Sequence, residues 1–318
     1  MRAGDWVEVR SEEEILSTLD DRGRLEALPF MPEMRQFCGK RFRVSKSAHK
    51  TCDTIERYVG RRMASAIHLE GVRCDGAAHD GCQAGCLLFW KTAWLKPVGG
   101  ARAEARADAR CSREQLARAT RANGDNGGAV RYQCQATELL RATTPLTWWD
   151  PRQYWRDLVS KNVRLRDLVR YVILAAYNAV MRLHWRGRPY PSLRGLADGK
   201  TPTVILNLQP GELVRVRPKG EIMRTLNEGL RNRGLKFDVE MVPYCGKTFR
   251  VLRRVERIVN EKTGQMMHLP GACLILEGVT CSGCLSTKRL FCPRSVYPYW
   301  HEIWLQRAAG RDAAVGSG

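Results

Sequence analysis

The sequence predicts an α+β protein in which a small β-rich module with short helices occurs twice, the two copies being joined by a helical connector. Three observations lead to this prediction. A shift of 207 positions places three motifs near the N-terminus on three motifs near the C-terminus. Apolar residues alternate within these motifs with the period of a strand, and a long apolar segment between the copies indicates a helix.

The repeated motifs share one register, which excludes a chance similarity. GDWVEVR at Gly4 aligns with GELVRVR at Gly211, CGKRFRV at Cys38 with CGKTFRV at Cys245, and LEGVRC with LEGVTC. After Cys74 the second copy has three additional residues, so the later motifs align at a shift of 210. We therefore predict four segments, namely a module over residues 4–98, a linker over 99–130, a helical connector over 131–200 and a second module over 211–307.

Each module is expected to begin with a strand and a short helix. Val7 and Val9 alternate with charged residues, as in a strand with one buried face, and the second copy repeats this pattern. Ser11 and Glu14 have the spacing of a capping box, and apolar residues follow at helical intervals. A short helix therefore follows the first strand.

Later segments of the module predict further strands and a common core. Phe42 and Val44 lie on a second strand, and a third strand leads into the LEGV motif. The last segment contains two tryptophans four positions apart, a spacing that suits one face of a helix and one face of a strand. We expect one core per module, with Phe42, Val44, Trp90 and Trp94 in the first and Phe249, Val251, Trp300 and Trp304 in the second.

These motifs resemble known proteins at two levels. The entry of Gly-Asp or Gly-Glu into a Val-x-Val strand, followed by short strands and a Gly-Lys turn, resembles small SH3-like barrels. That resemblance implies two SH3-like modules but no function. With GDWVEVRS, FCGKRFRV, VPYCGKTFRV, LEGVTC and CPRSVYPYWHEIWL, the whole chain resembles an uncharacterised family of bacterial tandem-repeat proteins. This second resemblance implies no known activity, and it implies an association with genes of polysaccharide synthesis.

The cysteines predict a metal site in each module. Three cysteine positions occur in both copies, and each copy has one further cysteine close by. Four thiolates are the usual ligands of a structural zinc ion, an iron–sulfur cluster is the alternative because it takes the same ligands, and buried thiols without a metal are the third interpretation. The two predicted zinc sites are Cys38, Cys74, Cys82 and Cys86 in the first module and Cys245, Cys281, Cys284 and Cys292 in the second.

The remaining cysteines and several histidines lie outside these two sets of four. Cys52 and Cys273 lack a counterpart in the other copy, which favours packed thiols, and Cys111 and Cys134 lie outside the modules without an assigned role. A mixed site remains open in the first module, where the substitutes for Cys86 are His49, Cys52, His68 and His79.

The charge of the chain predicts polyanionic partners. With 53 Lys and Arg residues against 33 Asp and Glu residues, the formal net charge is +20. Nucleic acid, anionic lipid and acidic glycan are the partner classes that such a charge favours, and a basic surface that only maintains solubility is the simpler interpretation. The residues expected to contact the polyanion are Arg10, Lys40, Arg43, Arg217, Lys247 and Arg250.

The start of the chain has no signal peptide pattern, so we expect a cytoplasmic protein, or one peripheral to the inner membrane, with reduced thiols. Residues 171–181 are apolar apart from Asn178, and this length suits a core helix or an interfacial helix rather than a membrane span. Its flanks are basic and aromatic, with Arg164, Arg166, Arg170, Arg182, Arg186 and Arg188 and with Trp148, Trp149, Trp155 and Trp185.

We expect this helix to dock within the protein, which would cover its apolar residues. The alternative is a helix on a membrane surface, and it would leave an exposed stripe of Val172, Ile173, Ala176 and Val180. The linker before it is rich in Ala, Arg and Gly, which predicts a solvated helix or a mobile segment.

No phosphate-binding loop, nucleophile elbow or HExxH motif occurs in the sequence. Glu33 and Glu240 share a Glu-Met context and form the one candidate acid/base pair, although such carboxylates are usually solvated.

These observations leave two functional hypotheses. The first is a non-enzymatic, zinc-stapled protein that binds a polyanion or acts as a scaffold. The second is a metal-dependent enzyme or accessory factor of surface-polysaccharide synthesis at the cytoplasmic membrane face, so the sequence leaves enzymatic activity undecided.

Overall fold

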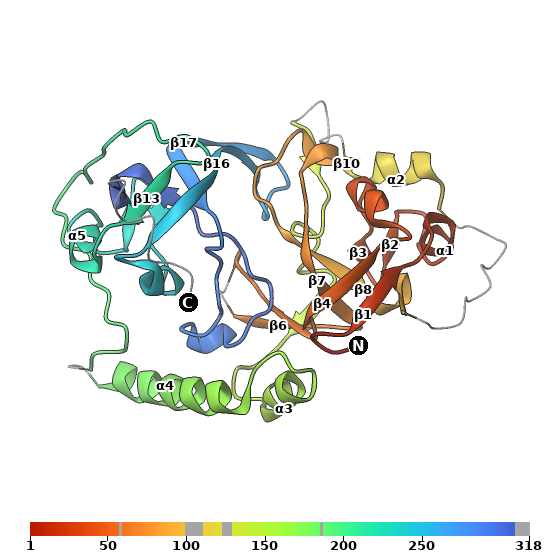
Figure 1. Cartoon of the computed structure of the whole chain (residues 1–318), viewed down its shortest axis with the longest axis horizontal. Coiled ribbons are helices and arrows are strands. Elements are labelled where there is room, and N and C mark those ends of the chain that lie inside the picture. Colours follow the sequence, from red (N-terminus) through yellow and green to blue (C-terminus); the bar gives the residue numbers. More distant parts are fainter. Residues whose placement is uncertain (57–58, 99–110, 123–128, 185–186, 309–318) are drawn as a thin grey trace. The chain divides into compact units, whose positions relative to one another are not determined.

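The computed structural model of the chain describes residues 1–56, 59–98, 111–122, 129–184 and 187–308 (Figure 1). Helices and antiparallel sheets are both present, which confirms the α+β class. The chain divides into two compact units. The first unit consists of Met1–Ile173, Arg257–Met267 and Thr287–Ser295, and the second consists of Leu174–Glu256, His268–Ser286 and the chain from Val296. Two segments of the second sequence module therefore belong to the first unit.

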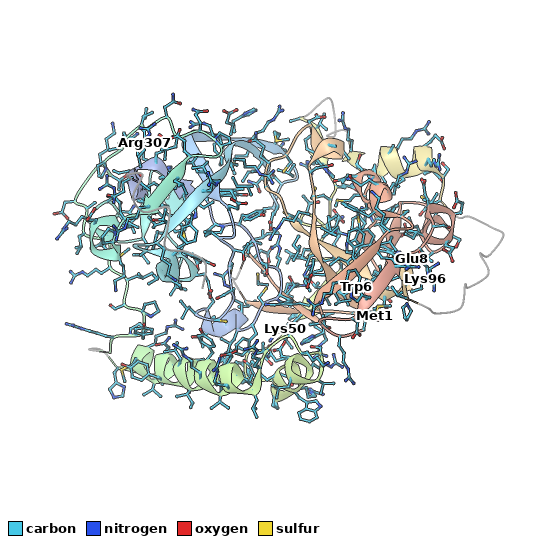
Figure 2. All side chains as sticks on the ribbon, viewed as in Figure 1. Met1, Trp6, Glu8, Lys50, Lys96 and Arg307 are labelled. Atoms are coloured by element: carbon cyan, nitrogen blue, oxygen red, sulfur yellow. The ribbon has the colours of Figure 1, made fainter. Side chains whose placement is uncertain are left out.

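The first unit is built on a five-stranded antiparallel sheet that curls into a half-barrel. Its order is β8 (Leu87–Lys91), β7 (Ala66–Arg73), β4 (Arg41–Ser47), β1 (Trp6–Val9) and β9 (Leu95–Pro97). Strand β1 pairs with a neighbouring strand on each side. Its Val7 lies opposite Phe42 in β4 and opposite Pro97 in β9. On the same strand Glu8 forms a cross-strand ion pair with Lys96 at 2.9 Å (Figure 2).

The second copy of the module has a five-stranded sheet of the same order. It runs β18 (Trp300–His301), β17 (Met266–Leu276), β16 (Thr248–Val259), β13 (Leu213–Val216) and β19 (Leu305–Arg307). Val214, the counterpart of Val7, lies opposite Phe249 and Arg307, which are the counterparts of Phe42 and Pro97. Strand order and pairing register therefore recur between the two copies.

Short elements also recur at matching positions. In each pair below, the first element belongs to the first copy. The short helix and the two short strands are α1 (Glu12–Leu16) with α5 (Lys219–Met223), β2 (Arg24–Leu25) with β14 (Arg231–Asn232), and β3 (Leu28–Pro29) with β15 (Leu235–Lys236). The 3-10 helices are η1 (Pro32–Phe37) with η5 (Val239–Tyr244), η2 (Ala77–His79) with η6 (Thr287–Arg289), and η3 (Thr92–Trp94) with η7 (Glu302–Trp304). The predicted capping box begins α1, since Ser11 Oγ accepts the Glu14 N–H at 3.2 Å and Glu14 accepts the Ser11 N–H at 2.8 Å.

The tryptophan pairs complete the two cores as predicted. Trp90 and Trp94 are buried with Val44, and Phe42 packs against this core while staying partly buried. The second copy reproduces the arrangement with Trp300, Trp304, Val251 and Phe249. The ambiguous segment is a strand followed by a 3-10 turn, so the first tryptophan of each pair lies on the strand and the second on the turn.

The predicted linker and connector contribute to the first unit. Helix α2 (Arg113–Ala119) lies in the predicted linker, and its Leu116 is buried in the core together with Cys111. The remaining linker residues, 99–110 and 123–128, lie outside the described part of the chain. The predicted helical connector begins with strands rather than helices, because β11 (Arg131–Tyr132) pairs with β10 (Arg121–Ala122) and β12 (Thr143–Pro145) pairs with β6 (Gly60–Met63), which also pairs with β5 (Lys50–Cys52).

Segments of the second copy complete the first unit through reciprocal contacts. Cys82 Sγ accepts a hydrogen bond from the Val259 N–H at 3.3 Å, and Cys52 is hydrogen-bonded to Cys292. In the alignment Cys52 is the counterpart of Val259, and Cys292 is the counterpart of Cys82. Equivalent positions of the two copies thus meet twice within the first unit, once through a backbone N–H and once through two cysteine side chains.

Two helices end the connector, α3 (Pro151–Val159) and α4 (Leu165–Leu183). Helix α3 is attached to the rest of the first unit by the buried ion pair of Asp157 with Lys50, at 2.6 Å. Helix α4 buries Ala175 and Asn178 but leaves Ile173 exposed. Our expectation that docking covers the apolar residues is wrong for four of them, since Val172, Ile173, Ala176 and Val180 are all exposed.

Candidate metal centre

Three potential metal ligands converge in the first unit. Glu33 lies on η1, Cys74 follows β7, and His79 ends η2. Their ligand atoms lie within 4.8 Å of one another, and among the residues that the structure describes no other group of three or more His, Cys, Asp or Glu side chains does so. The loop between the last two ligands is tight. A Cβ on Gly76 would lie 2.0 Å from the Cys82 carbonyl oxygen, so only glycine fits.

The contacts within the group indicate room for one cation. The Cys74 thiol lies 3.2 Å and His79 Nδ1 lies 3.1 Å from Glu33 Oε1. His79 Nε2 lies 3.3 Å from the Gln133 carbonyl, which can only accept, so Nε2 carries a proton. Nδ1 is then free to bind a metal, or it is protonated and paired with the carboxylate. The other glutamate oxygen, Oε2, is buried and has no hydrogen-bond partner among the described residues.

The donor set fits zinc. Zinc binds thiolate at about 2.3 Å and imidazole or carboxylate at about 2.0–2.2 Å, so neighbouring ligands of a tetrahedral ion are roughly 3.3–3.8 Å apart. The two contacts around Glu33 Oε1 are close to that spacing. The hydrogen bond from His79 to the Gln133 carbonyl is the outer contact that usually orients a histidine ligand. A mixed Glu, Cys and His group suits zinc better than an iron–sulfur cluster, whose ligands are cysteines.

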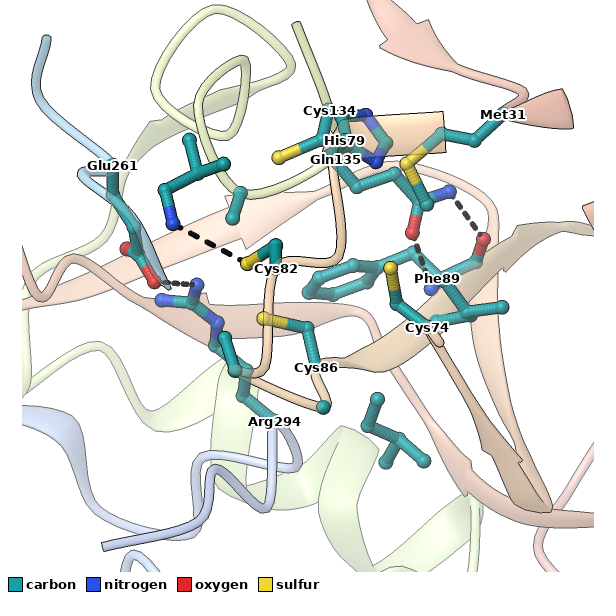
Figure 3. A pocket seen from close by; sticks show the side chains of 16 residues that line it. Met31, Cys74, His79, Cys82, Cys86, Phe89, Cys134, Gln135, Glu261 and Arg294 are labelled. Atoms are coloured by element: carbon teal, nitrogen blue, oxygen red, sulfur yellow. Dashed lines mark hydrogen bonds and ion pairs between the residues drawn. The ribbon is translucent and has the colours of Figure 1, made fainter. Parts of the chain in front are cut away.

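A cavity of about 40 Å³ adjoins the group. Its lining includes Cys74 and His79 together with three further cysteines, Cys82, Cys86 and Cys134 (Figure 3). On one side lies the ion pair of Arg294 with Glu261, at 2.7 Å. Burial raises the pKa of Cys86 to about 12 and that of Cys134 to about 11. Burial and the neighbouring Glu33 also raise the pKa of Cys74, so these thiols stay protonated at neutral pH unless a cation displaces the protons.

The structure does not bring the first predicted set of four sulfurs together. Of that set, Cys74 joins the Glu33 group, and Cys82 and Cys86 line the adjoining cavity. Cys38 instead ends η1 and packs against the core. Its CGK motif is a turn from η1 into β4, in which Gly39 has φ +73°.

The second set is also dispersed. Cys245 repeats the role of Cys38, because it ends η5 and is followed by Gly246 with φ +78°. Burial raises the pKa of Cys38 and of Cys245 to about 11. Cys281 and Cys284 belong to the second unit, whereas Cys292 belongs to the first unit, where its partner is Cys52.

Glu240, the counterpart of Glu33, is buried as well, so neither carboxylate is solvated as we expected. Its two oxygens accept hydrogen bonds from Ser282 Oγ at 2.7 Å and from the Leu285 N–H at 2.8 Å. Arg289 stands at the position that corresponds to His79. Glu33 and Glu240 belong to different units, and each has its own local partners.

The six predicted polyanion contacts fall into two groups. Arg10 and Arg217 are half-buried and form equivalent ion pairs, with Glu14 and Glu221, both at 3.1 Å. The other four are exposed, namely Lys40, Arg43, Lys247 and Arg250. The equivalent arginines of this group hydrogen-bond to equivalent glycines, with Arg43 Nε 3.4 Å from the Gly4 carbonyl and Arg250 Nη1 2.7 Å from the Gly211 carbonyl.

Sequence reasoning missed part of this centre. His79 was considered only as a substitute for Cys86, and Cys134 was given no role. The spacing of Cys74, His79, Cys82 and Cys86 within thirteen residues was a readable signal of a ligand loop. Glu33 and Gln133 gave no such signal, because their distance from the loop in the sequence hides their contact.

No helix of the described residues combines the length and apolarity needed to cross a bilayer. No known protein family, curated protein or solved structure that was compared with this chain matches it.

Proposed function

We propose that the protein is a tandem-repeat, zinc-stapled binding protein that engages polyanions without catalysing a reaction. The observation that carries this proposal is the buried group of Glu33, Cys74 and His79, with its unpartnered carboxylate oxygen. A metal held there would join η1, the end of β7 and η2 in the first unit. Its binding free energy would then contribute to folding.

The fourth ligand of this zinc ion is expected from the adjoining cavity, where Cys82 and Cys86 are the nearest candidates in the sequence. A cysteine in that position closes the coordination shell, as in structural zinc sites. The second copy offers no equivalent, because hydrogen bonds already satisfy Glu240. We therefore propose one zinc ion per chain rather than two.

Metal analysis of the protein purified without added metal tests this part of the proposal. The expected result is one zinc ion per chain, and its loss in Cys74→Ala and His79→Asn variants. Cys281→Ala is the matched control, since Cys281 is the counterpart of Cys74 in the second copy. Protein that holds no metal, or a Cys74→Ala variant that keeps it, would contradict the proposal.

The polyanion would contact the exposed basic residues that recur on the two copies, Lys40 with Arg43 and Lys247 with Arg250. The net charge of +20 supports this part of the proposal. Binding of heparin or single-stranded nucleic acid should weaken steeply with added salt, because counterions are released when phosphates or sulfates are neutralised. Lys40→Glu with Arg43→Glu should weaken binding, because both residues are exposed and Arg43 has only a long contact with Glu70, at 3.8 Å. Charge reversal at Arg10, which is half-buried and paired with Glu14 at 3.1 Å, should matter less.

A metal-dependent enzyme or accessory factor of polysaccharide synthesis is the second candidate. It is favoured by the count of three ligands beside a cavity, because catalytic zinc sites keep one position for water or substrate. Cobalt-substituted protein distinguishes the two. If an added anion such as azide changes the visible cobalt spectrum, the coordination shell has an open position. An unchanged spectrum supports a closed, structural site.

We also propose that each copy is an SH3-like barrel. The shared order of five antiparallel strands and the Gly-Lys turn into the long second strand support this assignment. An experimental structure in which either sheet stays flat would contradict it.

A further inference from the structure

We propose that the exposed apolar face of α4 is a binding surface for anionic lipid membranes. This inference names a partner for the polyanion-binding proposal and rests on that proposal only for the sign of the charge. Helix α4 has its amphipathic character reversed relative to an ordinary surface helix, because its polar Asn178 is buried while apolar residues of the opposite face are exposed.

Hydrogen bonds fix this orientation of α4. Asn178 Nδ2 donates to the Tyr190 carbonyl at 2.7 Å, and Asn178 Oδ1 accepts the Tyr190 N–H at 2.7 Å. Turning α4 against the segment that contains Tyr190 would break both bonds and leave the buried Asn178 amide without these partners. The exposed face is therefore a property of the folded chain.

The exposed residues follow the spacing of one helical face. Relative to the first member they lie at intervals of 4, 7, 8, 11, 15 and 18 positions, and the stripe consists of Leu165, Val169, Val172, Ile173, Ala176, Val180 and Leu183. Ile173 is 64% exposed. A helix of this length extends about 28 Å, so the stripe is longer than the scattered apolar residues of an ordinary surface.

Helix α3, which precedes α4 in the chain, exposes aromatic residues. Trp155 is 68% exposed on α3, and Trp149, just before the helix, is 67% exposed. The buried pair of Lys50 and Asp157 attaches the opposite side of α3 to the first unit. Tryptophans with one exposed face are enriched where proteins meet the headgroup region of a bilayer.

The charges beside the stripe favour an anionic bilayer over a neutral surface. Between residues 150 and 183 there are seven Arg and Lys residues against three Asp residues, a net charge of +4. Arg166 and Arg170, both exposed, lie one turn apart on one flank of the stripe. Asp167 is the acidic residue of α4 and lies 3.7 Å from Arg166. Arginines on the flank of an apolar stripe can contact lipid phosphates while the stripe itself enters the boundary between headgroups and acyl chains. Trp185 and Arg186, which also flank the helix in the sequence, lie outside the described residues.

Flotation of the full-length protein with vesicles tests the proposal. We expect the protein to float with vesicles of phosphatidylcholine and phosphatidylglycerol, to float poorly with phosphatidylcholine alone, and to lose binding as salt is added. Ile173→Asp should lower the partition coefficient about tenfold or more, because it replaces an isoleucine that would be buried in the membrane interface with a charged residue. Each loss of a flanking arginine, in Arg166→Gln and Arg170→Gln, should lower it about fivefold.

The chain offers a matched control. Ile205 is 78% exposed and lies outside α3 and α4, so Ile205→Asp makes the same chemical change at another exposed position. It should float like the wild type. Should Ile173→Asp alter the circular dichroism spectrum, the arginine variants provide the second measurement, since they change exposed side chains only.

Three results would overturn the proposal: no flotation with either vesicle, equal flotation of Ile173→Asp and the wild type, or a wild-type dimer that Ile173→Asp converts to a monomer without any flotation. The last result would identify the stripe as a self-association surface. Failure here is distinguishable from failure of the proposed function, because metal content and heparin binding do not depend on Ile173.

Discussion

Glu33 and Glu240 occupy the same position in the two copies of the module, and both are buried, but their surroundings differ. Glu240 receives one hydrogen bond at each oxygen, from Ser282 and Leu285. Glu33 faces the thiol of Cys74 and the ring of His79, and its second oxygen has no partner among the described residues. One carboxylate is therefore satisfied by neutral donors, whereas the other has a place for a cation.

The three extra residues of the second copy lie between Cys281 and Cys292, in the segment that supplies Ser282 and Leu285. The first copy lacks this extension and has His79 in its short loop. The two copies thus close the same buried glutamate differently, with hydrogen bonds in the longer loop and with two potential metal ligands beside the shorter one. The shared framework tolerates both solutions because the strands and core do not depend on the loop.

The largest expected effect concerns a feature that the two copies share. Trp94 donates to Thr18 Oγ1 at 3.1 Å, and Trp304 donates to Thr225 Oγ1 at 3.0 Å. Trp94→Ala and Trp304→Ala should each lower the free energy of unfolding by about 3–5 kcal/mol, because each removes a fully buried aromatic side chain. Urea unfolding measures this loss. A strongly unequal response would show that the two cores are less alike than their registers indicate.

The next effect should distinguish the copies. Removing the metal with a chelator should lower the unfolding free energy by about 3–4 kcal/mol if free zinc had exceeded its dissociation constant by about 100–1,000-fold. The Cys74→Ala variant should be insensitive to the chelator, whereas Cys281→Ala should respond like the wild type. Thermal unfolding with and without chelator measures both. Equal sensitivity of the two variants would contradict the difference between the copies.

A pH effect should separate the copies in acid. His68 is fully buried, and burial lowers its pKa to about 3, whereas the second copy has Ile275 at this position. The unfolded chain binds a proton below its pKa of about 6.5 but the folded chain does not, so stability falls as the pH decreases from about 6.5 towards 4.

His68→Ile should remove this component, which amounts to about 2 kcal/mol at pH 5. Urea unfolding of the wild type and the variant at pH 7 and pH 5 measures it. Parallel pH profiles of the two proteins would show that His68 does not contribute.

The smallest effect again concerns a shared feature. Gly39 and Gly246 have φ values of +73° and +78° in the two CGK turns. Gly39→Ala and Gly246→Ala should each cost about 1 kcal/mol or slightly more, because alanine disfavours this backbone conformation while no neighbouring atom blocks its Cβ. Thermal midpoints of the two variants should shift alike. A shift in only one of them would indicate that the turns differ.

Local patterns in the sequence were sufficient for the equivalent strands and the two cores. The shift of 207 positions predicted which strands are equivalent, and the pairing of Val7 with Phe42 recurs as Val214 with Phe249. The capping box at Ser11 and the buried tryptophans were also predicted correctly. These features depend on neighbours in the chain or on periodicity, and a repeated sequence displays both twice.

The metal centre was predicted only in part. Cys74 was a predicted ligand and His79 an alternative one, but Cys38 was assigned to the site because CGK recurs in both copies. Its recurrence has a different cause, since Gly39 is needed for the turn after η1. In the sequence, a motif that recurs because the backbone needs glycine in a turn cannot be distinguished from one that recurs because its cysteine binds a metal.

By itself, then, the sequence determined which segments of the two copies are equivalent, the capping box at Ser11 and the residues of the two cores. Tertiary structure alone decided that Glu33 meets these residues, that Cys292 lies beside Cys52 in the first unit, and that α4 exposes its apolar face. The physical reason is the range of the interactions. Periodicity, caps and glycine turns act over a few residues, whereas the convergence of ligands and the orientation of a helix depend on contacts between segments far apart in the chain.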